Sequence, residues 1–352
     1  MLILRRYAVL ALAGCAVGHP LGAQATRPAV HVIATGGTIS NLGDSGRLSG
    51  KQLVAAIPRL DSVARVSVEQ FSNVSSGEIT TAQWMALARR INDLFAARPD
   101  LHGVVVTHGT DTLEETAYFL DLTVAGCRPV VVTGAMRNPT MVAPEGPANL
   151  YNAVRVAAAP EAERRGAMVL LNDEIFAARD VAKTNTVRLN AFGAPGRGPI
   201  GVADPEGLAF ARPPAREGCA APVFGLGTLT DLPRVDIIYS YVGADSVLID
   251  AAVAAGAKGI VVATVGRGGS TPGQDRALDR AVDRGVFVVA SSRTGSGRVP
   301  VARATELERW KPGKGAQFGA DDLNPQKARV LLMLALTRFT TAKDIADSFR
   351  KF

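Results

Sequence analysis

The sequence predicts an α/β protein with two domains: a larger N-terminal domain with a mostly parallel sheet flanked by helices, and a smaller C-terminal α/β domain. Two observations lead to this prediction. Continuous apolar runs rich in valine recur along the chain, a pattern typical of strands buried on both faces of a parallel sheet. Segments with helical spacing of apolar residues lie between these runs, and such alternation is typical of α/β folds.

The predicted strands share a polar ending, because most of them finish in Thr, Ser or Gly. Ligands of α/β folds bind outside the carboxyl ends of the strands, so these endings predict where a site lies. The strands are expected at residues 30–37, 103–111, 129–136, 167–173, 235–241, 259–269 and 285–297.

Three helices are predicted most clearly, at residues 81–100, 113–124 and 324–337. In the first of them apolar side chains recur at helical spacing, and Thr80 or Thr81 is suited to cap its N-terminus.

A segment rich in Gly and Pro, from about residue 190 to 233, interrupts the alternation of strands and helices. We therefore expect an N-terminal catalytic domain at residues 26–210, a linker at 211–233 and a C-terminal α/β domain at 234–352.

Residues 1–25 have the pattern of a secretory signal peptide: Arg5 and Arg6, a short apolar run, and an A-x-A ending at residues 23–25. An alternative is a lipoprotein signal, in which Cys15 is the lipidated residue. The apolar run is too short to span a bilayer, and no later segment is predicted to do so. Both alternatives predict a periplasmic or secreted protein, lipid-anchored in the cell envelope in the second case.

Composition and motifs exclude several classes of function. The formal net charge is +7, but the basic residues are scattered and aromatics make up only 5% of the chain, which argues against nucleic-acid binding. No metal-ligand spacing, Walker loop, G-x-G-x-x-G or G-x-S-x-G motif occurs. We therefore expect neither a metal nor another cofactor. Cys127 and Cys219, the cysteines that follow the leader, leave a disulfide and two buried thiols equally open.

After these exclusions, catalysis by a threonine hydroxyl is the chemistry that the sequence still supports. Thr38 follows the first predicted strand, and Thr110 and Asp111 follow the second. A threonine hydroxyl needs a nearby base to act as a nucleophile, and Lys183 in a polar segment is a candidate, since desolvation favours a neutral amine. Each of these residues also has an alternative, purely structural interpretation. These are a helix cap at Thr110 or Asp111, a turn at Gly36 that needs positive φ, and a surface lysine at position 183.

Taken together, the motifs resemble those of the bacterial type II L-asparaginases, in order and over nearly all of the chain that follows the leader. They are T-G-G-T-I at residues 35–39, T-H-G-T-D-T-L-E-E-T-A at 107–117, G-A-M-R at 134–137, G-P-A-N-L at 146–150, K-T-N-T at 183–186 and L-N-P-Q-K-A-R at 323–329.

The resemblance implies a hydrolase of asparagine catabolism that converts L-asparagine and water to L-aspartate and ammonia, without a cofactor and through a threonine acyl-enzyme. Thr38 matches the primary nucleophile. Thr110, Asp111 and Lys183 match a second catalytic triad, and Asp111 also matches the carboxylate that binds the substrate's α-ammonium. Ser76 matches the serine that holds the α-carboxylate.

The binding site implied by the resemblance further includes Gly37 and Gly77, and the glycines after the first strand are interpreted as clearance for the substrate. A homotetramer or homodimer is implied as well.

The chain departs from the family pattern at three places. The loop at residues 41–50 lacks the usual tyrosine, and Arg47 is nearest to its position. Gly77 replaces a frequent glutamine, and we expect Glu78 to substitute in part for the absent glutamine amide. Gly269 stands where the family has an asparagine that completes a neighbour's site.

Because of these departures, the sequence predicts a glutaminase activity that is low or that it does not determine. A hydrolase of glutamine or peptide-linked asparagine, or a non-catalytic exported amino-acid-binding protein, remain alternatives.

Overall fold

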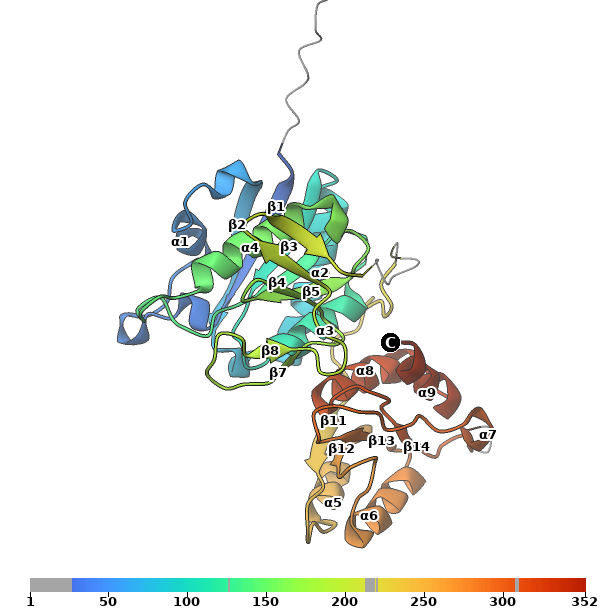
Figure 1. Cartoon of the computed structure of the whole chain (residues 1–352). Coiled ribbons are helices and arrows are strands. Elements are labelled where there is room, and N and C mark those ends of the chain that lie inside the picture. Colours follow the sequence, from blue (N-terminus) through green and yellow to red (C-terminus); the bar gives the residue numbers. More distant parts are fainter. Residues whose placement is uncertain (1–26, 126, 213–218, 220, 308–309) are drawn as a thin grey trace, which may run out of the picture.

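The computed structural model describes residues 27–125, 127–212, 219, 221–307 and 310–352 (Figure 1). The predicted signal peptide and Cys15 lie outside the described residues. The two-domain α/β fold predicted from the sequence is confirmed, with one large sheet in the N-terminal half and a smaller one in the C-terminal half.

The N-terminal domain is built on an eight-stranded sheet of order β10-β9-β6-β5-β4-β3-β1-β2. The five strands from β2 to β5 in this order are parallel, whereas β6, β9 and β10 are antiparallel. Their bounds are β1 Ala29–Gly36, β2 Arg65–Val74, β3 Leu101–Thr107, β4 Val130–Thr133, β5 Ala167–Leu171, β6 Glu174–Ala177, β9 Gly201–Asp204 and β10 Gly207–Phe210.

Helices cover both faces of this sheet, which explains the continuous apolar runs. On β3, Val104 and Val106 pack with α2 and α3, while Val105 packs into the core on the opposite side with α1 and α4. Every residue of such a strand meets an apolar layer, so no polar alternation is needed. The helices are α1 Gly50–Ala55, α2 Thr81–Ala97, α3 Leu113–Thr123 and α4 Gly146–Ala158. Thr80 caps α2.

The C-terminal domain holds a parallel four-stranded sheet of order β11-β12-β13-β14. Helices α5 and α6 pack on one face, and α8 and α9 pack on the other. The elements are β11 Val235–Tyr239, α5 Val247–Ala254, β12 Gly259–Thr264, α6 Pro272–Asp283, β13 Phe287–Ser292, α7 Ala304–Leu307, β14 Gln317–Gly319, α8 Pro325–Arg338 and α9 Ala342–Lys351.

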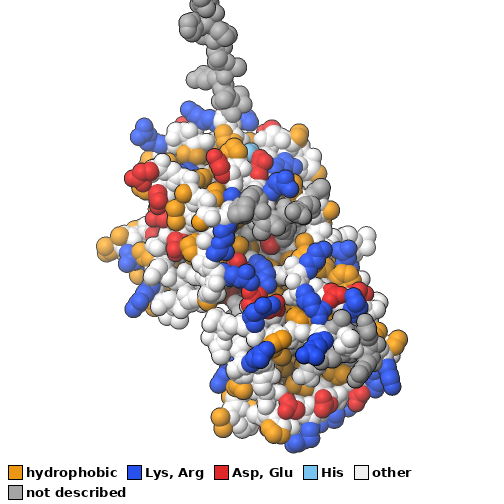
Figure 2. Space-filling model, turned by 45° about the vertical axis from the view of Figure 1, so that its right-hand side comes forward, with side chains coloured by type: hydrophobic (Ala, Val, Ile, Leu, Met, Phe, Trp, Pro, Cys, Tyr) orange, Lys and Arg blue, Asp and Glu red, His pale blue; other side chains and the backbone are white. Residues whose placement is uncertain are grey.

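The two domains share packed side chains and ion pairs. Helix α8 packs against α3, and one apolar cluster continues from the N-terminal domain into the C-terminal one. Figure 2 shows basic side chains gathered where the domains meet. Across the domain boundary, Arg179 and Arg197 both bind Asp322, with Nη2–Oδ distances of 2.7 and 2.5 Å.

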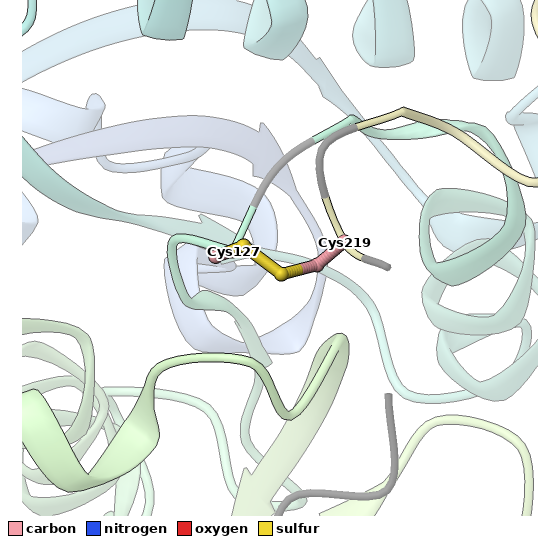
Figure 3. The surroundings of a disulfide bond; sticks show 2 residues. All are labelled: Cys127 and Cys219. Carbon is pink, nitrogen blue, oxygen red and sulfur yellow. A yellow bond between two sulfur atoms is a disulfide. The ribbon is translucent and has the colours of Figure 1, made fainter. Parts of the chain in front are cut away.

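Cys127 and Cys219 form a disulfide, with their Cα atoms 4.9 Å apart (Figure 3). This bond resolves the alternative that the sequence left open. It joins the loop that follows α3 to the segment that precedes the C-terminal domain. Within the described ranges, no helix combines the length and the apolar character needed to cross a membrane.

Candidate active site

The loops that follow β1 and β3 lie side by side, because the two strands are parallel neighbours. Gly37 has φ +85°, and a Cβ placed on it would lie 2.3 Å from Gly109 Cα. A Cβ on Gly36, at φ +112°, would lie 2.4 Å from the carbonyl oxygen of Val74. The predicted positive-φ turn is therefore confirmed. The interpretation of these glycines as clearance for a substrate is wrong, because backbone fills that space.

Two threonines flank these glycines, and the structure gives them different surroundings. Thr35 is buried and its Oγ1 donates a hydrogen bond to the carbonyl oxygen of Thr107 at 2.8 Å. Thr38 is half-buried at the start of the 3-10 turn Thr38–Ser40, and no other described residue hydrogen-bonds its hydroxyl. The Thr35 hydroxyl is thus tied to the neighbouring strand, whereas the Thr38 hydroxyl has no such bond among the described residues.

Lys183 joins the two polar residues that follow β3. Its Nζ donates to Thr110 Oγ1 at 2.9 Å and to Asp111 Oδ1 at 2.6 Å. Thr110 is buried, whereas the Asp111 side chain is 78% exposed and faces solvent. The Lys183 side chain is only 17% exposed, so it is not a surface lysine. The N-cap of α3 is Thr112, and the alternative that Thr110 or Asp111 caps this helix is wrong.

Ser76 and Gly77 lie in a 3-10 turn, Ser76–Glu78, directly after β2. Ser76 is buried against the loop after β3: the Thr112 hydroxyl donates to its carbonyl oxygen at 2.9 Å, and a Cβ on Gly109 would lie 2.8 Å from Ser76 Cβ. Gly77 is exposed, with nothing within 4 Å of a Cβ placed on it. Glu78 binds the backbone N–H of Ser75 at 2.8 Å, so this carboxylate caps its own turn and does not take the place of a glutamine amide at position 77.

Arg47 connects the loop of Thr38 to the loop of Ser76. Its Nη1 donates to the carbonyl oxygen of Gly37 at 3.3 Å, and its Nη2 donates to Ser75 Oγ at 2.8 Å. A bridge between Asn41 and Arg47 closes the intervening loop on itself. The sequence identifies Arg47 only as the residue nearest to a missing tyrosine, because its hydrogen bond to Ser75 joins segments 28 residues apart.

His108 supports the Thr110 loop from beneath, a role that the sequence did not reveal. Nδ1 lies 2.8 Å from the carbonyl oxygen of Gly109, which only accepts, so this nitrogen carries the proton. Nε2 then accepts from Thr116 Oγ1 at 3.0 Å, and Trp84 Nε1 donates to the same hydroxyl at 2.7 Å. Complete burial lowers the pKa of His108 to about 4, which keeps the ring neutral.

A cavity of about 510 Å³ opens beside Lys183 and Asp111, and the C-terminal domain contributes to its wall through Gln326 on α8. Gly269, which the sequence motifs place opposite a family asparagine only as an expectation, lies in a tight turn after β12 and is hydrogen-bonded to Val265. Within the part of the chain that the structure describes, no group of three His, Cys, Asp or Glu side chains is placed to hold a metal ion.

Comparison with known proteins gives consistent matches over the chain. Residues 29–216 match the family model "Asparaginase, N-terminal", and residues 234–349 match "Glutaminase/Asparaginase C-terminal domain". The chain is 44% identical to L-asparaginase 2 of Bacillus subtilis, covering 92% of this chain and 87% of that protein. It is 39% identical to L-asparaginase 2 of Escherichia coli, covering 97% and 98%. A crystal structure of a probable cytoplasmic L-asparaginase from Campylobacter jejuni superposes with a TM-score of 0.85 at 40% identity, covering 93% of this chain and 100% of that one.

Proposed function

Because the chain belongs to the asparaginase family, we propose that it is an L-asparaginase, which hydrolyses L-asparagine to L-aspartate and ammonia. The observation that carries this proposal is the contact of Lys183 with both Thr110 and Asp111, beside the loop of the free Thr38 hydroxyl. A threonine, a lysine and a carboxylate in contact supply a hydroxyl, a proton carrier and a site for a cation.

In the first step, the Thr38 oxygen forms a bond to the side-chain amide carbon of the substrate. The C–N bond then breaks, the nitrogen takes up the hydroxyl proton, and ammonia leaves an ester on Thr38. In the second step, water attacks the ester carbon, the bond to Thr38 breaks, and its oxygen regains a proton. Lys183 and Thr110, 2.9 Å apart, relay these protons and activate the water.

Substrate binding uses one charged group and one neutral hydroxyl. The exposed Asp111 carboxylate receives the α-ammonium, and Ser76 receives the α-carboxylate. Backbone N–H groups close to Thr110 face the oxyanion, a contribution of about 3–4 kcal/mol for each donor. Gly37 keeps the Thr38 loop in contact with the Thr110 loop, and Gly77 leaves open space beside Ser76.

The open space at Gly77 favours a second candidate within the same chemistry, a hydrolase of a larger amide such as glutamine or peptide-linked asparagine. A non-catalytic binding protein is disfavoured, because holding an amino acid does not require a lysine in contact with a buried threonine hydroxyl.

Ammonia release from asparagine, glutamine and an alanyl-asparagine dipeptide tests these alternatives. We expect release from asparagine by the purified protein, and a loss of about 10³-fold or more in kcat for Thr38→Ala and Thr110→Ala. Thr35→Ser is the control, since Thr35 lies on β1 three residues before Thr38 and its hydroxyl binds only a main-chain carbonyl oxygen; this variant is expected to keep its activity. Release of ammonia from none of the three substrates would reject the proposed function and its second candidate.

We also propose export. The disulfide between Cys127 and Cys219 supports this location, because such bonds persist in oxidising compartments. Mass spectrometry of the mature protein separates the two signal alternatives: a free N-terminus at Thr26, or a lipidated Cys15.

We further propose that the protein is a homotetramer or homodimer. Exposed apolar side chains crowd the carboxyl ends of β11 and β12 and the start of α5, a concentration that is unusual on the surface of a monomer. They are Tyr239, Tyr241, Val242, Val247, Leu248 and Val265. Light scattering after size exclusion gives the mass, and Val242→Asp is expected to weaken the assembly if this surface is buried in it.

A further inference from the structure

Lys183 lies on β7, Ala182–Lys183, a strand of two residues that pairs antiparallel with β8, Phe192–Gly193. So short a ribbon supplies little stability, so other elements must hold the ammonium 2.9 Å from Thr110. The main-chain N–H of Lys183 donates to Glu114 Oε2 at 2.7 Å. Glu114 stands in the first turn of α3, four residues after Thr110, so α3 holds the main chain of Lys183 close to the target of its ammonium.

The other oxygen of Glu114 is bound from the C-terminal domain. Asn324 Nδ2 donates to Glu114 Oε1 at 3.2 Å. Asn324 Oδ1 accepts the backbone N–H of Lys327 at 3.0 Å and so caps α8. Because both ends of the Asn324 amide are used, its orientation is determined. The first turn of α8 is therefore tied to the carboxylate that holds Lys183.

The same turn binds the chain just before Lys183. Lys327 Nζ donates to the carbonyl oxygen of Arg179 at 2.9 Å and also to that of Val181. Lys327 is 1% exposed and Glu114 is 5% exposed. Burial lowers the pKa of Lys327 to about 8 while the charge of Glu114 opposes that shift, and burial raises the pKa of Glu114 while the charge of Lys327 opposes it. Each buried charge thus offsets the desolvation of the other.

We infer that Glu114 and Asn324 are positioning residues for Lys183, so that the C-terminal domain sets the distance between the Lys183 ammonium and the Thr110 hydroxyl. This inference rests on the proposed hydrolase function. The inference also assigns a role to the L-N-P-Q-K-A-R motif, because Asn324 and Lys327 of that motif contact Glu114 and the chain just before Lys183. Proton transfer depends steeply on distance, so a small shift of this segment slows the reaction without removing the substrate's own binding groups.

The two single variants E114Q and N324D each break the Glu114–Asn324 bond by a different route. In E114Q the introduced amide can accept from Lys183, but its NH₂ group then faces the NH₂ group of Asn324. In N324D the introduced carboxylate still caps α8, but it faces the carboxylate of Glu114. We expect each variant to lower kcat for asparagine about tenfold or more and to leave KM within about twofold.

The double variant E114Q/N324D restores the bond with donor and acceptor exchanged. The introduced amide donates to the introduced carboxylate, its oxygen accepts from Lys183, and one negative charge remains near Lys327. We expect kcat to return to within about threefold of the wild-type value. A double variant as slow as the slower single variant overturns the inference, as do single variants with wild-type kcat.

Thr341→Ala is the matched control for loss of a helix cap, because Thr341 caps α9 in the same domain and, among the described residues, its hydroxyl hydrogen-bonds only Asp344. We expect a lower melting temperature and unchanged kcat. If Thr341→Ala lowers kcat as much as N324D does, general destabilisation explains both and the inference fails. A wild-type protein that releases no ammonia rejects the proposed function itself, whereas an active wild type with unaffected variants rejects only the positioning role.

Discussion

At the scale of single residues, the site depends on the contrast between a buried hydroxyl and an exposed carboxylate that share one ammonium. Thr110 is 4% exposed and the Asp111 side chain is 78% exposed, and Lys183 reaches both. A group in this position can pass a proton between the interior and a water at the surface.

Replacing Lys183 by arginine tests whether the amine must release its proton. A guanidinium keeps the positive charge but does not deprotonate in proteins, so Lys183→Arg cannot act as a base. We expect kcat to fall about 10²–10⁴-fold, as in Lys183→Met, when ammonia release is measured for both variants. Substantial activity in Lys183→Arg would show that the charge alone is needed.

His108 predicts a dependence of stability on pH. Its pKa is about 4 in the folded protein against 6.5 in the unfolded chain, because burial disfavours the charged ring. The unfolded chain therefore binds the proton first as pH falls. The free energy of unfolding is therefore not reduced by this group above pH 6.5. It falls by up to about 3 kcal/mol as the pH is lowered to about 4.

The measurement is the free energy of unfolding between pH 4 and 7 for the wild type and His108→Gln, which keeps one donor and one acceptor. We expect a shallower pH dependence in the variant, and the difference between the two curves isolates His108 from His31, whose pKa burial also lowers. Parallel curves would contradict a neutral, buried His108.

At the scale of elements, the loop between β1 and α1 is held in place by Arg47, whose two hydrogen bonds reach Gly37 and Ser75. Lysine carries the charge but lacks the planar guanidinium whose two separate nitrogens make these bonds, and alanine forms neither bond. We expect Arg47→Ala to lower kcat/KM for asparagine about tenfold, with Arg47→Lys in between. Because the bonds are partly exposed, the free energy of unfolding should change by less than about 1 kcal/mol. Equal kcat/KM values in all three proteins would mean that this loop needs no such support.

The strands that the sequence predicted most clearly are those buried on both faces of their sheet. β1, β3, β4 and β5 read as continuous apolar runs, and α2, α3 and α8 have clear apolar spacing. β2 was missed because it is a half-exposed edge strand of mixed residues. β6, β9 and β10 were missed because they are short and lack the run of valines that marks β4.

For the site, the sequence identified residues that end strands, since parallel neighbours bring their carboxyl ends together. Thr38 and Thr110 were found in this way. The roles of Arg47, Glu114 and Asn324 were not, because each depends on a contact between distant segments. The role of His108 was not found either, because its complete burial comes from the folded protein. The catalytic roles of Thr38, Thr110, Asp111 and Lys183 stay predictions until the variants are assayed.

At the scale of the whole molecule, Asp322 of the C-terminal domain binds Arg179 and Arg197 of the N-terminal domain. Burial alone would raise the pKa of Asp322, but hydrogen bonds from the two arginines outweigh it and lower the pKa to about 2. This contribution to stability is complete above pH 3.8 and is lost as pH falls through about 2.

Asp322→Asn is therefore expected to lower the free energy of unfolding by about 2 kcal/mol at pH 7. The gap between wild type and variant should close below about pH 3, which denaturant titrations at several pH values would show. Arg298→Gln is a useful comparison, since Arg298 pairs with the neighbouring Asp321 but is 74% exposed and should change stability little. A gap that stays constant down to about pH 2 would argue against the ion pairs as its origin.

The contact between Gly37 and Gly109 also decides where protein engineering can succeed. Any side chain at either position would collide with the main chain or with Ser76, so libraries built there should return glycine alone. Gly77 offers the opposite case, an exposed position with open space around its Cα. Selection for a changed amide preference is best directed to Gly77, where a Cβ meets no neighbouring atom and the backbone is not left-handed.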